Sequence, residues 1–154
     1  MMNFKQLYRQ PLRTVPISLI VILFLVALIG FADSSYLTLE HYQGRIPPCT
    51  TTANCDLVLT SSYSSIAGLP VALLGSIYYL LILIGLFAYF ESRNINILKS
   101  TLLFTVAGLL ASMVFVFIQV FLLRSYCQYC LLSALTSTIL FAGAMHIFLH
   151  HQES

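Results

Sequence analysis

Charged side chains are scarce in this chain of 154 residues: only 8% are Asp, Glu, Lys or Arg, whereas 59% are hydrophobic. A soluble domain has roughly 25% charged and 45–50% apolar residues. So few ionic groups cannot cover a soluble surface, which excludes the soluble globular class. The net charge of +2 says nothing in favour of a nucleic-acid partner. No polar segment is large enough for a soluble domain, so we expect one membrane domain over residues 1–154.

In place of charged segments, the chain has long apolar runs. About 20 apolar residues, at roughly 1.5 Å of rise per residue, cross the hydrocarbon core of a membrane as a helix. The predicted spans are residues 15–34, 68–90, 98–123 and 127–149. The predicted fold class is therefore all-α, a bundle of four transmembrane helices. A cleaved signal peptide is the alternative for the first run, but its apolar region would have only about 7–15 residues.

The longest polar segment, residues 33–66, separates the first two spans and contains Cys49 and Cys55. Its prolines disfavour a helix, and its Asn and Asp residues favour turns. We expect an extracytoplasmic loop with a short interfacial helix at residues 61–65. Asp33, at the end of the first span, is interpreted as solvated or capping, although a truly buried intramembrane acid is functional by default.

Basic residues indicate the orientation of the bundle, because Lys and Arg concentrate on the cytoplasmic side. One side carries Lys5, Arg9, Arg13, Arg93 and Lys99. The other side carries only Arg45 and Arg124. Both termini are therefore predicted to be cytoplasmic. Both cysteine pairs then face the opposite compartment, where disulfides persist.

The four cysteines form two pairs, and one of them, Cys127 and Cys130, is a Cys-x-x-Cys at the start of the fourth span. The positive potential of a helix N-terminus and the nearby Arg124 favour a thiolate, so Cys127 is predicted to be the reactive thiol with a lowered pKa. Cys130 lies one turn deeper, within reach of a lipid-soluble oxidant. Cys49 and Cys55 can exchange with a soluble partner and with the helical pair by thiolate attack. The pattern indicates an electron relay from water to membrane.

Other interpretations of the cysteines stay open at this point. They could form two structural disulfides, which are common in exported segments. A four-thiolate zinc or copper site is a further alternative, although such sites usually show two short-spaced pairs. His146, His150 and His151 lie on the predicted cytoplasmic side and are interpreted as a solvated helix end, so no metal site is predicted.

Several segments carry a family resemblance. They are DSSYL at 33–37, CDLVLTSSYS at 55–64, GLPVALLG at 68–75 and YCQYCLLS at 126–133. Together they resemble the vitamin K epoxide reductase family, over nearly the whole stretch from residue 33 to about residue 137, and the four cysteines fall in the family order.

This resemblance implies a four-helix bundle that encloses a quinone of the ubiquinone, menaquinone or vitamin K type near the outer face. Cys130 would contact the quinone, and Ser61 matches a serine that the family keeps near the active site. Cys127 would exchange with the loop pair, of which Cys49 or Cys55 would exchange with a partner. Prokaryotic members oxidise thioredoxin-like proteins. The resemblance thus implies a quinone-dependent thiol oxidoreductase of a bacterial inner membrane that re-oxidises a periplasmic DsbA-like protein.

Two departures separate the chain from animal members, which reduce vitamin K epoxide. Ala134 stands where they have tyrosine, and Val71 stands where they have asparagine. Reduction of the epoxide or of the quinone is the alternative function, beside a membrane scaffold with structural disulfides. The order of the cysteine pairs is the reverse of that in the unrelated DsbB-type oxidases. Many bacterial members carry a fused thioredoxin-like domain, whereas this chain stops at Ser154, so we expect its partner to act in trans.

Overall fold

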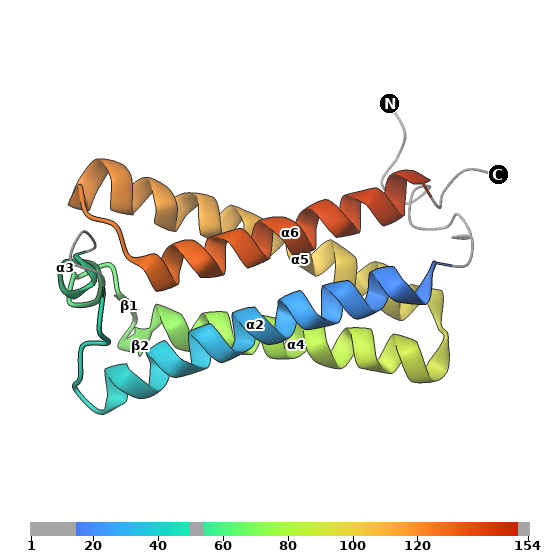
Figure 1. Ribbon diagram of the computed structural model, residues 1–154, viewed down its shortest axis with the longest axis horizontal. Coiled ribbons are helices and arrows are strands. Elements are labelled where there is room, and N and C mark those ends of the chain that lie inside the picture. The colour runs from blue at the N-terminus through green and yellow to red at the C-terminus, as the bar shows by residue number, and fades with distance from the viewer. Residues whose placement is uncertain (1–14, 50–53, 151–154) are drawn as a thin grey trace.

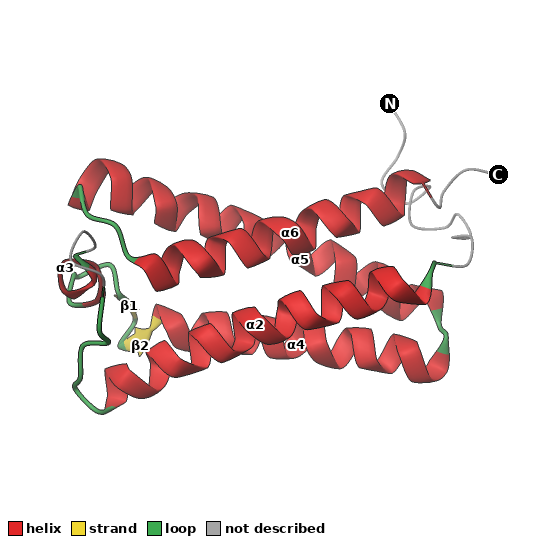
Figure 2. Cartoon of the chain, in the orientation of Figure 1, coloured by secondary structure: helices red, strands yellow, loops and turns green. Residues whose placement is uncertain are grey.

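The computed structural model describes residues 15–49 and 54–150. Four long helices lie side by side, and the short elements gather at one end of them (Figures 1 and 2). In chain order the elements are α2 (Ile17–Tyr42), α3 (Cys55–Leu59), β1 (Ser65–Ile66), β2 (Leu69–Pro70), α4 (Val71–Ser92), α5 (Ile95–Phe117), the π-helix η1 (Ile118–Leu123) and α6 (Gln128–His150).

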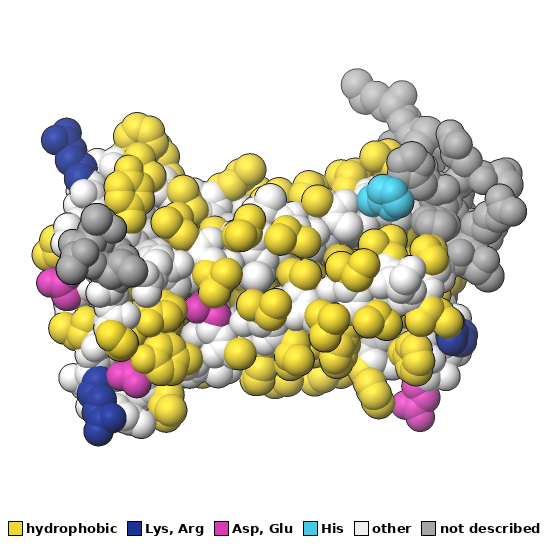
Figure 3. Space-filling view, viewed as in Figure 1, with side chains coloured by type: hydrophobic (Ala, Val, Ile, Leu, Met, Phe, Trp, Pro, Cys, Tyr) yellow, Lys and Arg dark blue, Asp and Glu magenta, His cyan; other side chains and the backbone are white. Residues whose placement is uncertain are grey.

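Each long helix has the length and apolar composition that a membrane span needs. The four candidate spans are Ile17–Tyr42, Val71–Ser92, Ile95–Leu123 and Gln128–Leu149. Apolar side chains cover the visible face of the bundle along its length, whereas Lys and Arg side chains lie at its two ends (Figure 3). The predicted four-helix membrane bundle is confirmed, and the chain is an integral membrane protein. Its orientation in the membrane stays a prediction.

The first helix is longer than the sequence predicted, because α2 continues eight residues beyond position 34. Hydroxyl groups within this stretch bond to the helix itself: Ser34 Oγ donates to Gly30 O at 2.8 Å, and Thr38 Oγ1 donates to Ser34 O at 2.7 Å. These bonds satisfy the hydrogen-bonding groups of polar side chains in a segment that the sequence predicted to be a loop. The helix ends at Tyr42, and Gly44 follows with a positive φ of 65°, the left-handed conformation that commonly comes after a helix.

The predicted interfacial helix is present but misplaced, since it is α3 and not residues 61–65. After α3 the chain forms the hairpin of β1 and β2, in which Ile66 pairs with Leu69. The two residues between them, Ala67 and Gly68, have φ of 52° and 81°, the conformation that a two-residue hairpin loop requires. Pro70 then stands immediately before α4, close to the predicted start of the second span.

Packing is uneven along the bundle. α2 and α5 each pack against both α4 and α6, so the four helices form a closed ring. The buried apolar core lies in the half of the bundle away from α3. It includes Leu23 and Ala27 of α2, Ile82 and Leu86 of α4, Leu98 and Leu102 of α5, and Leu140 and Ile147 of α6. The other half is hollow, and it carries the cysteines.

Candidate active site

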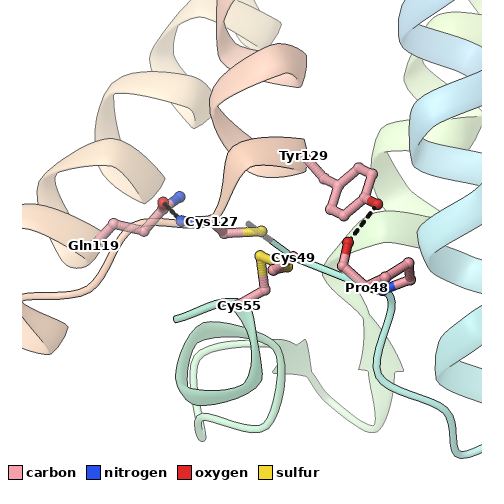
Figure 4. Close-up of a disulfide and its surroundings, with 6 residues drawn as sticks. All are labelled: Pro48, Cys49, Cys55, Gln119, Cys127 and Tyr129. Carbon is pink, nitrogen blue, oxygen red and sulfur yellow. Dashed lines mark hydrogen bonds between the residues drawn. A yellow bond between two sulfur atoms is a disulfide. The ribbon is translucent and has the colours of Figure 1, made fainter. Parts of the chain in front are cut away.

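Cys49, Cys55 and Cys127 meet where α3, η1 and the start of α6 come together (Figure 4), and Cys130 packs against the same cluster. Cys49 and Cys55 form a disulfide with Cα atoms 6.2 Å apart, whereas Cys127 and Cys130 are free thiols. Cys55 and Cys127 are 1% and 0% exposed and share one buried cluster with Val58. Cys49 and Cys130 pack against the same cluster. Two pairs that are 72 residues apart in the sequence, counted from Cys55 to Cys127, are thus in one contact group.

The backbone of Cys127 is held by Gln119, a residue that the sequence did not single out. Cys127 immediately precedes α6, and its carbonyl oxygen accepts the Leu131 N–H at 3.0 Å, so Cys127 occupies the N-cap position. Its own N–H donates to Gln119 Oε1 at 3.1 Å (Figure 4). Gln119 is 3% exposed and belongs to η1, and π-helical turns frequently occur at functional sites. The only sequence signal for Gln119 is a lone polar residue within an apolar run.

Hydrogen bonds at the start of α6 make Cys127 acidic. The Cys130 side chain contributes most, backbone N–H groups of Cys130 and Tyr129 add to it, and burial and the Asp33 carboxyl oppose it. The result is a pKa lowered to about 7 for Cys127. The predicted direction is confirmed, but the exposed Arg124 is not among the contributing groups.

We expect the thiolate of Cys127 to appear with a midpoint near pH 7, because its pKa is lowered to about 7. The measurement is the ultraviolet absorbance of thiolate in wild-type protein minus that in Cys127→Ser. Cys130→Ala should move the midpoint upward, since it removes the largest contribution. The lowered pKa stabilises the folded protein above the unfolded value of about 8.5, and this contribution is lost as pH falls through 7. A wild-type midpoint at the unfolded value would contradict the assignment.

The first turn of α6 also holds the loop that carries Cys49. The Tyr129 hydroxyl donates to Pro48 O at 3.0 Å, one residue before the disulfide (Figure 4). The ring of Tyr129 packs against that of Tyr36, with centroids 5.7 Å apart. One short segment of α6 therefore positions both the reactive thiol and the loop disulfide.

A cavity of about 930 Å³ lies between the helices beside the cysteines. Cys130 lines it, and so does Ser61, whose hydroxyl donates to Val58 O at 2.8 Å. Val71 and Ala134 also line it with apolar side chains. Ligand pockets typically measure about 300–1,000 Å³ and are mostly apolar with a few polar groups. The hollow half of the bundle can therefore hold a ligand next to the deeper thiol.

Asp33 lies in this cavity and not in solvent. It is 8% exposed, and its Oδ2 atom is buried without a hydrogen-bond partner. The interpretation of Asp33 as a solvated or capping residue is therefore wrong. The reason is the extra length of α2, which carries Asp33 into the middle of a packed helix and not to its end.

A group of hydroxyls closes the cavity toward the packed core. The Tyr79 hydroxyl lies 2.7 Å from Ser133 O, 2.7 Å from Thr136 Oγ1 and 2.9 Å from Ser137 Oγ. These contacts tie α4 to the turn of α6 that follows Cys130. Buried hydroxyls inside a membrane bundle need such partners, because lipid offers none.

Comparison with known proteins agrees with this geometry. Residues 21–145 match the model of the vitamin K epoxide reductase family, a segment that covers most of the chain and includes all four cysteines. A search of curated proteins found no significant match. The family is associated with quinone and vitamin K substrates. The chain therefore belongs to the vitamin K epoxide reductase family and is an integral membrane oxidoreductase that acts on disulfides and quinones.

Proposed function

We propose that this protein is a quinone-dependent thiol oxidoreductase that re-oxidises a soluble thioredoxin-like, DsbA-like partner for disulfide bond formation. Electrons pass from the partner to Cys49 and Cys55, then to Cys127 and Cys130, and then to quinone. One observation carries the proposal: Cys55 and Cys127 share a buried cluster, while Cys130 packs against that cluster and also lines the cavity. Such a chain of contacts is what a relay from a loop disulfide to a bound acceptor needs.

The two sulfurs of the loop disulfide differ in access, which supports a direction for the first exchange. Cys49 is partly exposed, whereas Cys55 is 1% exposed and packs with Cys127. A partner thiolate attacks Cys49, and Cys55 leaves as thiolate. The second partner thiol then resolves the mixed disulfide, which leaves the partner oxidised and both loop cysteines reduced.

The second exchange regenerates the loop disulfide. The Cys55 thiolate attacks Cys127 in a Cys127–Cys130 disulfide, and Cys130 leaves as thiolate. Cys49 then attacks Cys55, which restores the loop disulfide and frees Cys127. In the proposed cycle, a loop disulfide together with two free helical thiols is the state after this exchange and before the electrons leave for quinone.

The cavity fits a quinone by its size, its mainly apolar lining and its position beside Cys130. When bound, a quinone supplies a two-electron acceptor, which is needed because a partner as oxidising as about −120 mV can be re-oxidised only by a stronger oxidant. Cys130 and Ser61 would border it, as the resemblance implied. Val71 and Ala134 offer apolar side chains where animal members have polar ones, which favours thiol oxidation over epoxide reduction. We place the protein in a bacterial inner membrane, with its cysteines on the periplasmic side.

The deciding experiment is a visible absorption spectrum of purified Cys127→Ser protein with added ubiquinone or menaquinone. Without Cys127, Cys130 has no disulfide partner in the helix and faces the cavity, so its thiolate should give an absorption band with the quinone. The double variant Cys127→Ser/Cys130→Ser should give none. A missing band, together with unchanged disulfide formation in cells that carry Cys130→Ser, would overturn the proposal in favour of structural disulfides.

A further inference from the structure

The carboxyl group of Asp33 is a buried polar group to which the relay gives no role. Asp33 lines the cavity, and its Oδ2 atom is buried without a partner. Cys130 lines the same cavity. A carboxyl that borders the same space as the deeper thiol is positioned to act on an acceptor bound there.

The Asp33 carboxyl lines the cavity, and its buried Oδ2 atom has no hydrogen-bond partner. A buried polar atom without a hydrogen bond costs about 1–3 kcal/mol, and more where the group is charged. Within residues 15–49 and 54–150, the only other buried side-chain atom without a partner is the Tyr78 hydroxyl, which lies near Ser137 without forming an adequate hydrogen bond. Tyr78 lines the same cavity. Both unsatisfied groups thus border the space that a ligand would fill.

We propose that Asp33 donates a hydrogen bond, and then a proton, to the quinone that accepts electrons from Cys127 and Cys130. This inference rests on the proposed function. Asp33 would therefore be a catalytic residue in contact with the electron acceptor, and intramembrane acids commonly serve in proton relays.

The balance of the reaction shows why a further acid is needed. Conversion of quinone to quinol takes two electrons and two protons. Both electrons come from Cys127 and Cys130, whose sulfurs become a disulfide. Cys130, which takes up a proton after it leaves as thiolate in the second exchange, supplies one proton, whereas the acidic Cys127 reacts as a thiolate without a proton. Asp33 supplies the second proton and becomes a carboxylate, which water at the outer end of the bundle re-protonates.

Other titratable groups around the cavity are less suited to this step. Besides Cys130, they are Glu40, His41, Arg45, Tyr63, Tyr78 and Tyr79. The first four are partly or fully exposed toward the outer end. The Tyr79 hydroxyl is already engaged with α6. Of the two carboxylic acids that line the cavity, Asp33 is buried and Glu40 is partly exposed.

The first test measures the purified protein in lipid vesicles with a reduced thioredoxin-like protein and ubiquinone or menaquinone. Asp33→Asn keeps a hydrogen-bond donor but cannot supply the proton, so kcat should fall about 10²-fold while the KM for quinone changes little. Glu91→Gln, at an exposed acid of α4 that does not line the cavity, is the control and should leave both constants unchanged. A wild-type kcat for Asp33→Asn would overturn the proposal.

The second test does not depend on turnover or on a foldable Asp33 variant. In Cys127→Ser/Cys130→Ser protein, an infrared difference spectrum on quinone addition should show a shifted C=O band of a protonated carboxyl. The chain has two aspartates, Asp33 and the exposed Asp56, so the band should move when aspartate is labelled with carbon-13. The absence of a label-sensitive band would overturn the role of Asp33. The proposed function fails separately, if wild-type protein shows no quinone-dependent thiol oxidation.

Discussion

Cys130→Ser is expected to stop turnover and to trap a disulfide between Cys55 and Cys127. The Cys127 thiolate attacks Cys55 in the loop disulfide, a new bond forms between these two buried sulfurs, and Cys49 leaves as thiolate. In the wild type, Cys130 can resolve this intermediate by attacking Cys127. In the variant only Cys49 can resolve the intermediate, and because Cys49 is partly exposed, an alkylating reagent can block its thiolate. Peptide mapping by mass spectrometry without reduction should find the Cys55–Cys127 bond and an alkylated Cys49.

Cys127→Ser is the matched control for this trap. It should also lose turnover, but its loop disulfide should stay intact and Cys49 should remain unlabelled, because the Cys127 thiolate that attacks Cys55 is absent. Two results would contradict the relay. One is a Cys130→Ser protein that keeps its loop disulfide under alkylation, and the other is a Cys130→Ser protein that still oxidises its partner. Either result would favour the interpretation that the cysteines form structural disulfides.

The four spans were predictable because a membrane imposes a length and an apolar composition that the sequence displays directly. The ends of the spans were less predictable where polar residues belong to a helix. Residues 33–42 read as loop, yet Ser34 and Thr38 bond back to the α2 backbone, and the helix continues. The short helix α3 was expected some residues later, because sequence alone does not show which turn of a polar loop is helical.

The cysteines were predictable as a set, whereas the groups that surround them were not. Gln119 stands eight residues before Cys127, and its contact with the Cys127 N–H depends on the π-helical turn and on the left-handed Arg124 that follows it. The Tyr129 hydroxyl donates to Pro48 O of the distant loop. The burial of Asp33 depends on the length of α2, which continues past it to Tyr42. Each of these roles arises from packing between segments, which no local pattern records.

Gly30→Ala is expected to destabilise the bundle by about 1–3 kcal/mol, the usual cost of overpacking. A Cβ at position 30 would overlap the ring of Tyr79, which is 1% exposed. Displacing that ring also strains the contacts of its hydroxyl with Thr136 and Ser137, which join α4 to α6 below the thiols. Thermal unfolding of the purified protein in detergent should show the lower stability.

Gly75→Ala is the matched control, because Gly75 is also a glycine within a long helix of the bundle. Its added Cβ would meet only the Ser34 Cβ at 3.4 Å, an ordinary contact, and alanine favours a helix over glycine by about 0.8–1.0 kcal/mol. We therefore expect unchanged or higher stability. In a Tyr79→Leu background the Gly30→Ala change should cost much less, since the overlapping ring is gone. If the cost is the same with and without the ring, the close approach of α2 to Tyr79 is not its cause, and the destabilisation must arise within α2 itself.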